Sequence, residues 1–194
     1  MSYVSFVISV IKDFKTKHSM ENVQLEKQAK LSEHFTLGEM TKTSTGMMNI
    51  PSRVSIENMK RVCGWLEALR ARYNQRYVSP PSDHPAHPGT PPDSGGEKDT
   101  EEPIIISSGY RSPEVNRRVG GSATSNHLTG CAVDIRVAGI EQALRYAVIL
   151  MDYADETRQD YDELLIERNR SGRYWVHFAV RPKDNRRKTR FIDC

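Results

Sequence analysis

The sequence predicts a single α+β domain with a small, mainly antiparallel sheet and helices packed on one face of it. Two observations carry this prediction. Stretches 56–72 and 140–153 have apolar residues at three- and four-residue steps, which is the period of an amphipathic helix. Stretches 131–137, 164–167 and 174–180 alternate in polarity, which is the period of a half-buried strand. A chain of 194 residues with 37% hydrophobic content is long enough to bury one core.

We expect residues 1–30 to be an N-terminal extension of a domain that covers residues 31–194. An apolar run covers Tyr3 to Ile11, but it has no basic region before it and no small-residue cleavage site after it. The run therefore fits a secretion signal poorly. It is also shorter than the roughly 20 residues that cross a bilayer, so we expect no stable membrane insertion.

Two capped helices and an insertion are predicted next. Thr36 and Glu39 have the spacing of a capping box, in which both side chains bond to free amides at a helix start. Ser55 is a candidate cap for the long helix that follows, whose apolar stripe we expect to lie on the sheet. Residues 79–102 are rich in proline, glycine and acids with almost nothing to bury, which predicts a disordered insertion within the domain.

Stretch 104–137 is expected to form a strand, a short helix, a glycine hinge and a second strand. The β-branched run at 103–107 is the first strand, and Ser112 followed by Pro113 gives an N-cap with proline at the first helical position. Gly120 and Gly121 would end that helix. After the second strand, a helix over 140–153 is expected to cover the sheet with one side of its surface. That side carries four apolar residues: Ile140, Leu144, Val148 and Met151.

Polar residues gather on the face of the sheet opposite the predicted core. Strand alternation places Asp134, Glu167 and His177 together on that face. A hydrolytic zinc site needs three protein ligands and one open position, and imidazole nitrogen and carboxylate oxygen are suitable ligands. His127, Asp134 and His177 meet this need, which predicts one zinc ion on this face. A histidine seven positions before a carboxylate also arises by chance, in which case these are ordinary residues of a partly buried sheet.

Composition excludes several classes of protein. The formal charge of +3 is much weaker than the concentrated excess expected of a nucleic-acid-binding protein, so we expect no nucleic acid partner. The three cysteines lack CxxC spacing, which argues against a disulfide framework and against a cysteine zinc site. The basic segment from Arg181 to Arg190 fits either attraction to an anionic polymer or a solvated tail.

Three segments carry a family resemblance: SGYRSPEVNRRVGG, SNHLTGCAVDI and YWVHFAV. They resemble the zinc D-Ala-D-Ala carboxypeptidase family, which belongs to a wider group with lysostaphin-type endopeptidases and the hedgehog signalling domain. In that family an SxHxxGxAxD segment supplies a histidine and an aspartate to zinc, and a WxH strand supplies the third ligand. These positions match His127, Asp134 and His177. The resemblance covers roughly residues 35–180 apart from the proline-rich insertion.

The resemblance implies a zinc metallopeptidase that hydrolyses peptide bonds in bacterial peptidoglycan. The bond would be either the terminal D-Ala-D-Ala bond, as in a carboxypeptidase, or one within the stem or cross-bridge, as in an endopeptidase of the endolysin type. Arg111 would hold the carboxylate of the substrate or polarise the scissile carbonyl, since its guanidinium offers a fixed fork of donors. Ser125 and Trp175 would contact the substrate. The plain alternative for Arg111 is a structural salt bridge.

The general base is less directly implied. Some members of the family place a glutamate or histidine three residues before the last zinc ligand, and that position is Tyr174 here. Glu167, across the hairpin from His177, is the best candidate, and Glu163 is the second. The implied reaction is amide hydrolysis by metal-activated water, in which Glu167 takes a proton and returns it to the departing amine. Two other readings remain: a non-catalytic zinc-containing binding module and a purely structural zinc domain.

The expected partner is a peptidoglycan stem peptide, and we expect the protein to be a monomer. In the absence of a clear secretion signal, we expect synthesis in the cytoplasm and action at the cell wall or periplasm, as for a phage or prophage lysin released by other means.

Overall fold

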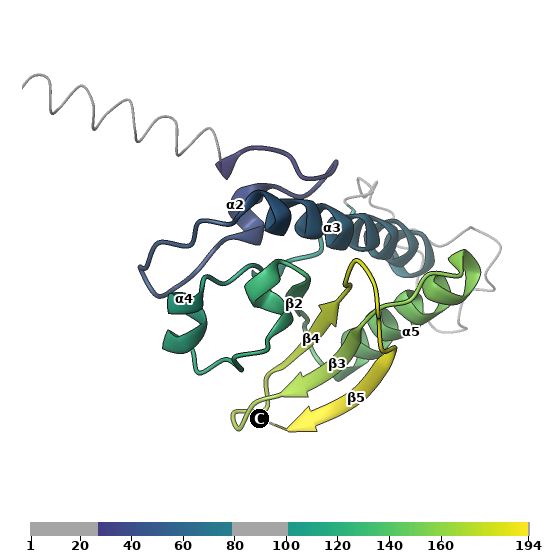
Figure 1. The fold of residues 1–194 in the computed structure, drawn as a ribbon. Coiled ribbons are helices and arrows are strands. Elements are labelled where there is room, and N and C mark those ends of the chain that lie inside the picture. Colours follow the sequence, from purple (N-terminus) through teal and green to yellow (C-terminus); the bar gives the residue numbers. More distant parts are fainter. Residues whose placement is uncertain (1–26, 79–100, 194) are drawn as a thin grey trace, which may run out of the picture.

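Five strands form one sheet in the order β1-β2-β4-β3-β5 in the computed structural model, which describes residues 27–78 and 101–193 (Figure 1). The strands are β1 (Ile106–Ser108), β2 (Ala132–Arg136), β3 (Glu163–Arg168), β4 (Tyr174–Ala179) and β5 (Lys188–Asp193). All neighbours pair antiparallel except β3 and β5, which are parallel. The predicted α+β fold with a mainly antiparallel sheet is therefore confirmed.

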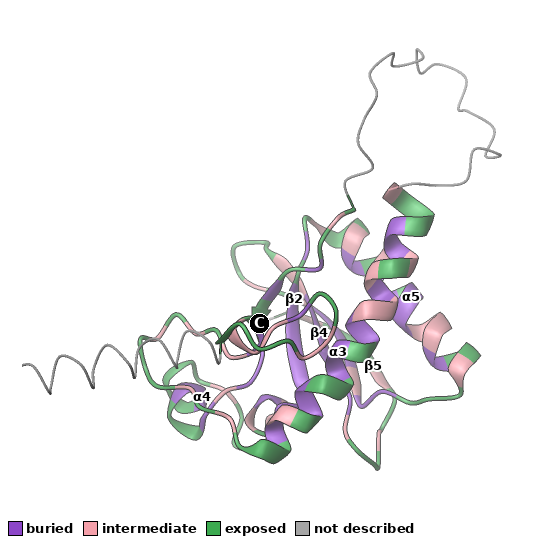
Figure 2. Ribbon diagram, turned by 90° about the horizontal axis from the view of Figure 1, so that it is seen from above, coloured by how far each residue is buried: buried purple, intermediate pink, exposed green. Residues whose placement is uncertain are grey.

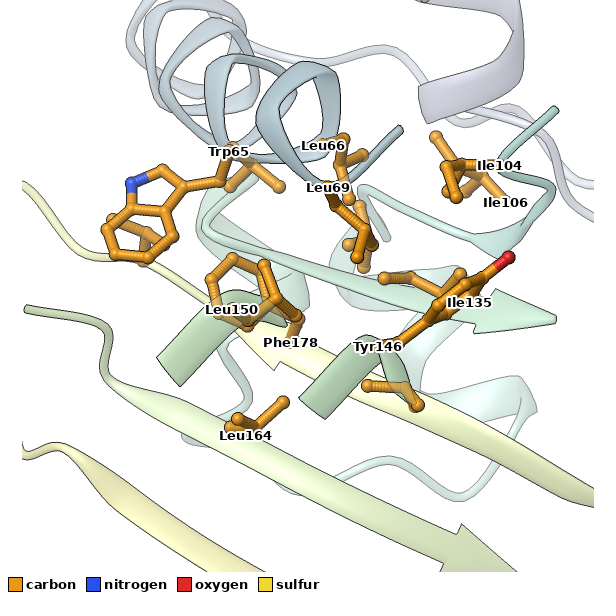
Figure 3. Close-up of a cluster of buried hydrophobic side chains, with 14 of the residues drawn as sticks. Trp65, Leu66, Leu69, Ile104, Ile106, Ile135, Tyr146, Leu150, Leu164 and Phe178 are labelled. Carbon is orange, nitrogen blue, oxygen red and sulfur yellow. The ribbon is translucent and has the colours of Figure 1, made fainter. Parts of the chain in front are cut away.

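Two long helices, α3 (Arg53–Tyr73) and α5 (Ile140–Thr157), pack on one face of this sheet. Figure 3 shows Leu66 and Leu69 of α3 above Ile135 of β2, with Leu150 of α5 near Phe178 of β4. These side chains belong to a single cluster of buried hydrophobic residues. Figure 2 shows β2 and β4, the strands beneath the helices, as buried over most of their length. Burial of this apolar surface is the main force that holds helices and sheet together.

Shorter helical segments also occur in the described residues. They are α2 (Leu37–Met40), the π-helical turn η1 (Asn74–Val78), α4 (Pro113–Arg118) and the 3-10 turn η2 (Asn126–Thr129). The predicted capping box is present, because the Thr36 hydroxyl accepts from the Glu39 amide and the Glu39 carboxylate accepts from the Thr36 amide. Ser112 caps α4, with Pro113 at its first position, as predicted.

The cap of α3 differs from the prediction. The helix begins at Arg53, and the Ser52 hydroxyl accepts a hydrogen bond from the Ser55 amide. Ser55 lies in the first turn, where it is buried. Both serines satisfy the sequence rule for a cap. The structure uses the earlier one: Ser52 has the extended conformation of an N-cap residue, with φ −73° and ψ 163°.

The side of α5 that faces the sheet also differs from the prediction. Ile140, Leu144 and Val148 are 37%, 44% and 44% exposed, so the predicted apolar side faces outward for most of its length. Half of the residues on the buried side are alanines; the buried residues are Ala143, Tyr146, Ala147, Ile149, Leu150 and Ala154. Alanines allow the helix backbone to approach the strands closely, and this explains why the alanine-containing side is buried.

The basic C-terminal segment is not a solvated tail over residues 188–193, which form β5 alongside β3. Several of its cations are already paired with acids, since Arg186 binds Asp162 and Lys188 binds Glu163. This pairing leaves less positive charge for a distant anionic polymer than the sequence implied.

The predicted extension and insertion lie mostly outside the described residues. Of the insertion at 79–102, only Glu101 and Glu102 are described: Glu101 forms an ion pair of 2.7 Å with Arg70, and the Glu102 amide donates to Asn74 at 2.6 Å. Of the extension at 1–30, the described part is 27–30, where Lys30 forms a bridge with Thr36. Within the described ranges, no helix combines the length and apolarity that a membrane span requires.

Candidate metal centre

The three predicted zinc ligands come together on the sheet face opposite α3 and α5. His127 lies in η2, Asp134 is the middle residue of β2, and His177 is its direct partner on β4. One nitrogen or oxygen atom from each residue lies within 4.8 Å of the others. The side chains are buried, with exposed fractions of 2% for His127 and 8% for Asp134 and His177. Two imidazoles and one carboxylate in this arrangement are a suitable ligand set for zinc.

The orientation of both imidazoles fits a shared metal position. His127 Nε2 lies 3.2 Å and His177 Nδ1 lies 2.9 Å from the same atom, Asp134 Oδ1. The outer nitrogen of His127, Nδ1, donates to the Gly109 carbonyl at 2.7 Å. Because a carbonyl can only accept, the proton of a neutral His127 ring is on Nδ1, which leaves the Nε2 lone pair free to bind a metal.

Local backbone geometry explains why His127 is held in this place. The Ser125 hydroxyl caps η2 by accepting from the His127 amide at 3.3 Å, and the His127 carbonyl accepts from the Arg111 amide at 3.0 Å. Gly130 then turns the chain into β2 with a φ of 74°, a value that glycine adopts without strain. A side chain at Gly130 would also overlap the Ser55 carbonyl of α3.

Gly109 supports the same histidine from the opposite direction. Its carbonyl accepts from His127, while the next amide, that of Tyr110, donates to the Met40 carbonyl of α2 at 2.7 Å. A Cβ atom at position 109 would overlap the Met40 carbonyl. The Gly109 backbone, whose carbonyl accepts the hydrogen bond from His127, therefore touches the backbone of α2 at a point where only glycine fits.

The charges of the centre depend strongly on one another. Burial would raise the pKa of Asp134, but the charges and hydrogen bonds of His127 and His177 hold it well below its usual range. Burial would lower the pKa of His177, but the hydrogen bond to Asp134 and the nearby Glu163 raise it to about 9. A metal ion that binds His177 must therefore displace a proton from it, which makes metal affinity dependent on pH.

Arg111 forms the salt bridge that was the plain alternative to a substrate-binding role. Its Nη2 lies 2.5 Å from Asp134 Oδ2, and its Nε donates to Ser108 Oγ at 2.9 Å. The two oxygens of Asp134 are thus divided, with Oδ1 toward the histidines and Oδ2 toward Arg111. Within the described part of the chain, Arg111 Nη1 forms no hydrogen bond, so this group remains available to a ligand.

Asn49 fixes the backbone on both sides of Arg111. Its amide nitrogen donates to the Tyr110 carbonyl at 2.8 Å and to the Thr41 carbonyl at 2.9 Å, and its oxygen accepts from the Ser112 amide at 2.7 Å. The sequence analysis missed this residue. Asn49 lies in a loop, and no periodic pattern marks a loop residue two of whose partners are more than sixty positions away.

Two glutamates of β3 share the face that carries His177, and their environments are opposite. Glu167 lies opposite Trp175, and Glu163 lies opposite Ala179. Burial, reinforced by the charge of Asp134, raises the pKa of Glu167. The contact with His177 and the ion pair with Lys188 hold the pKa of Glu163 well below its usual range. Glu167 is therefore the better suited of the two to accept and return a proton near neutral pH.

Two imidazoles and one carboxylate, with a second, partly buried carboxylate beside them, are a donor set typical of hydrolytic metal centres. A family model described as Peptidase M15 matches residues 97–162, which is about a third of the chain. The match includes Arg111, His127 and Asp134 and ends before Glu163 and His177. It confirms the resemblance to the zinc D-Ala-D-Ala carboxypeptidase-like family, and with the His-Asp-His cluster it supports a zinc metallopeptidase. A search of curated proteins found no match.

Proposed function

We propose that this protein is a zinc-dependent peptidase that hydrolyses peptide bonds in the stem peptides of bacterial peptidoglycan, as a D,D-carboxypeptidase or an endopeptidase. The observation that carries the proposal is the convergence of His127, Asp134 and His177, with donor atoms within 4.8 Å, in a chain that matches the M15 peptidases. The bacterial cell wall is the proposed place of action, and release in the manner of a phage or prophage lysin is consistent with it.

Glu167 is the proposed general base and acid. A zinc ion held by His127, Asp134 and His177 supplies a Lewis acid that polarises a carbonyl and lowers the pKa of water. Glu167 takes the proton of the attacking water and delivers it to the amine that leaves when the carbon–nitrogen bond breaks. Its raised pKa suits both halves of this transfer, because a carboxyl that ionises closer to neutral pH holds the proton long enough to return it.

Three further residues are proposed to hold the substrate. Arg111 directs its free Nη1 group to a carboxylate or to the carbonyl oxygen of the scissile bond, on which negative charge develops. Ser125 uses its oxygen to accept from the His127 amide, which leaves its hydroxyl proton for a substrate carbonyl. Trp175, half-buried beside Glu167 on the same face, offers an apolar wall.

Metal analysis of the purified protein tests the ligand set. We expect one zinc ion per chain in the wild type and none in His127→Ala. His34→Ala is a matched control, because His34 binds Glu67 and Arg70 of α3 outside the cluster. A wild-type protein that cannot be loaded with zinc would contradict the proposal.

Digestion of purified peptidoglycan, followed by mass assignment of the products, tests the substrate. Loss of one terminal alanine identifies a carboxypeptidase, whereas released stems or opened cross-links identify an endopeptidase. A non-catalytic zinc module of the same fold is the second candidate, because Tyr174 stands where some relatives carry the base. A zinc-loaded protein that yields no product from any peptidoglycan would favour this candidate.

A further inference from the structure

We infer that strand β5 takes part in the metal centre: Lys188 holds the Glu163 carboxylate in place, and Glu163 fixes the orientation of the His177 ring. Both are positioning residues, since they act on the metal through His177. The inference rests on the proposed zinc site and assigns a role to a segment beyond the family match, which ends at residue 162.

The two imidazoles of the centre are oriented in a similar way. Each directs its inner nitrogen to Asp134 Oδ1 and its outer nitrogen to an acceptor. For His127 the acceptor is the Gly109 carbonyl at 2.7 Å, and for His177 it is Glu163, whose Oε2 lies 3.7 Å from Nε2, an ion-pair contact that is longer than a hydrogen bond. An acceptor beside the outer nitrogen places the ring proton there, orients the ring and makes the inner nitrogen a better ligand.

The Glu163 carboxylate is held on both of its oxygens. Oε1 binds Lys188 Nζ at 2.9 Å and Arg186 Nη2 at 3.1 Å, while Oε2, the oxygen nearest His177, accepts from Asn126 Nδ2 at 3.1 Å. Its side chain is only 15% exposed, so these bonds are shielded from water. Bonds to charged groups in such a position are stronger than bonds between neutral groups, and they restrict the carboxylate to one orientation.

Strand pairing brings Lys188 to this carboxylate. Lys188 is the direct neighbour of Glu163 in the parallel register of β3 and β5, so the two side chains emerge on the same face. Arg186 is also bound to the fully buried Asp162, at 2.9 Å and 2.6 Å, and replacing it would disturb a second group. Within the described residues, Lys188 has Glu163 as its single side-chain partner. Lys188 is therefore the residue whose replacement tests the inference most cleanly.

The test is the zinc affinity of the full chain, measured by competition with a chromophoric chelator. Glu163→Gln is expected to weaken zinc binding by about 10- to 100-fold, which is the usual effect of losing a partner of a metal-binding histidine. Lys188→Met, which keeps the apolar stem, is expected to weaken it by several-fold. Lys188→Arg restores the cation and is expected to restore the affinity. Lys183→Met is the matched control. Lys183 is exposed, and its replacement by methionine changes the net charge by the same amount as Lys188→Met.

Several outcomes would overturn the inference. Equal zinc affinities for Lys188→Met and Lys183→Met show that Lys188 has no effect on the metal. Equal losses in Lys188→Met and Lys188→Arg show that the cation is not what matters. A lower melting temperature of metal-free Lys188→Met with unchanged zinc affinity shows a role in stability alone. A wild-type chain that binds no zinc overturns the proposed function as well, whereas zinc binding that is insensitive to Lys188 and Glu163 overturns this inference only.

Discussion

The two faces of the sheet are almost equally buried at their centres, but they use burial in different ways. On the face covered by α3 and α5, Phe178 and Ile135 are fully buried among other apolar side chains. On the other face, His127 and Asp134 are nearly as buried, yet their polar atoms all have partners. Burial of a polar group without a partner is costly, so the second face is held by specific bonds rather than by shape. Adjacent residues of one strand therefore allow the two kinds of burial to be compared directly.

The largest effect is expected on β3, where Glu167 and Ile166 point to opposite faces. Glu167→Gln keeps the shape of the side chain but cannot take a proton, so hydrolysis of peptidoglycan should fall by about 10²- to 10⁴-fold with zinc content unchanged. Ile166→Val should leave the rate unaltered and lower the free energy of unfolding by about 0.5–1.5 kcal/mol. The effect of Glu167→Gln is measured by the amount of peptidoglycan product formed and by metal content. The effect of Ile166→Val is measured by urea denaturation. Full activity in Glu167→Gln would remove Glu167 from the mechanism.

On β4, the neighbours Phe178 and His177 should differ in their effect on metal binding. Phe178→Ala leaves a cavity beneath α3 and α5 and should lower the free energy of unfolding by about 3–5 kcal/mol. His177→Ala should abolish zinc binding while the metal-free chain remains folded. Denaturant titration of both metal-free variants, with chelator competition for zinc, tests the pair. An unchanged free energy of unfolding in Phe178→Ala would contradict the view that the helix-covered face is held together by apolar packing.

Across a range of pH, the metal-free chain should lose stability as the pH rises. Burial acts to lower the pKa of His177, but its hydrogen bond to Asp134 and the nearby Glu163 raise the pKa to about 9. An unfolded histidine titrates near 6.5, so the folded state holds an extra proton between about 6.5 and 9. The stabilisation is complete below that window and is lost as the pH passes through it, by an amount on the order of 3 kcal/mol.

Urea unfolding at several pH values, in the presence of a chelator, measures this loss. The same series on His177→Gln is the control, because this variant has no imidazole to hold the proton. A slope of equal size in the variant would assign the pH dependence to another group.

The smallest effect is expected on the outer side of α5. Leu144 is half-exposed, so Leu144→Gln should change the free energy of unfolding by no more than about 0.5 kcal/mol. Leu150 belongs to the buried side of the same helix, and Leu150→Ala should cost about 2–5 kcal/mol. Thermal or urea denaturation compares them. A large loss in Leu144→Gln would mean that this side of α5 is covered by something in solution.

The shared face of Asp134, Glu167 and His177 could be predicted because the information is local, whereas His127 was singled out by the resemblance of its segment to the family motif. A period of two fixes which face a strand residue occupies, and this alone placed Asp134, Glu167 and His177 together. The side of α5 could not be predicted by the same reasoning, because the helix carries two apolar stripes. The choice between Leu144 and Leu150 depends on how closely the backbone must approach the sheet.

Other features depend on partners that are distant in the chain. Strand β5 is a charged edge strand, and it is recognisable as a strand only beside β3, whose Glu163 neutralises Lys188. Asn49 lies in a loop and obtains its role from the backbone at Tyr110 and Ser112. Sequence patterns record local periodicity, whereas these roles arise when separate segments meet.

The contact at Gly109 affects how a saturation mutagenesis screen of this protein would be interpreted. The side chain of any other residue at position 109 would overlap the Met40 carbonyl. The backbone that must then move carries the carbonyl that accepts the hydrogen bond from His127. Such variants should score as inactive alongside replacements of the metal ligands, even though residue 109 has no functional group. Without the structure, such a screen would suggest a catalytic side chain at position 109, although this position requires a residue that has no side chain.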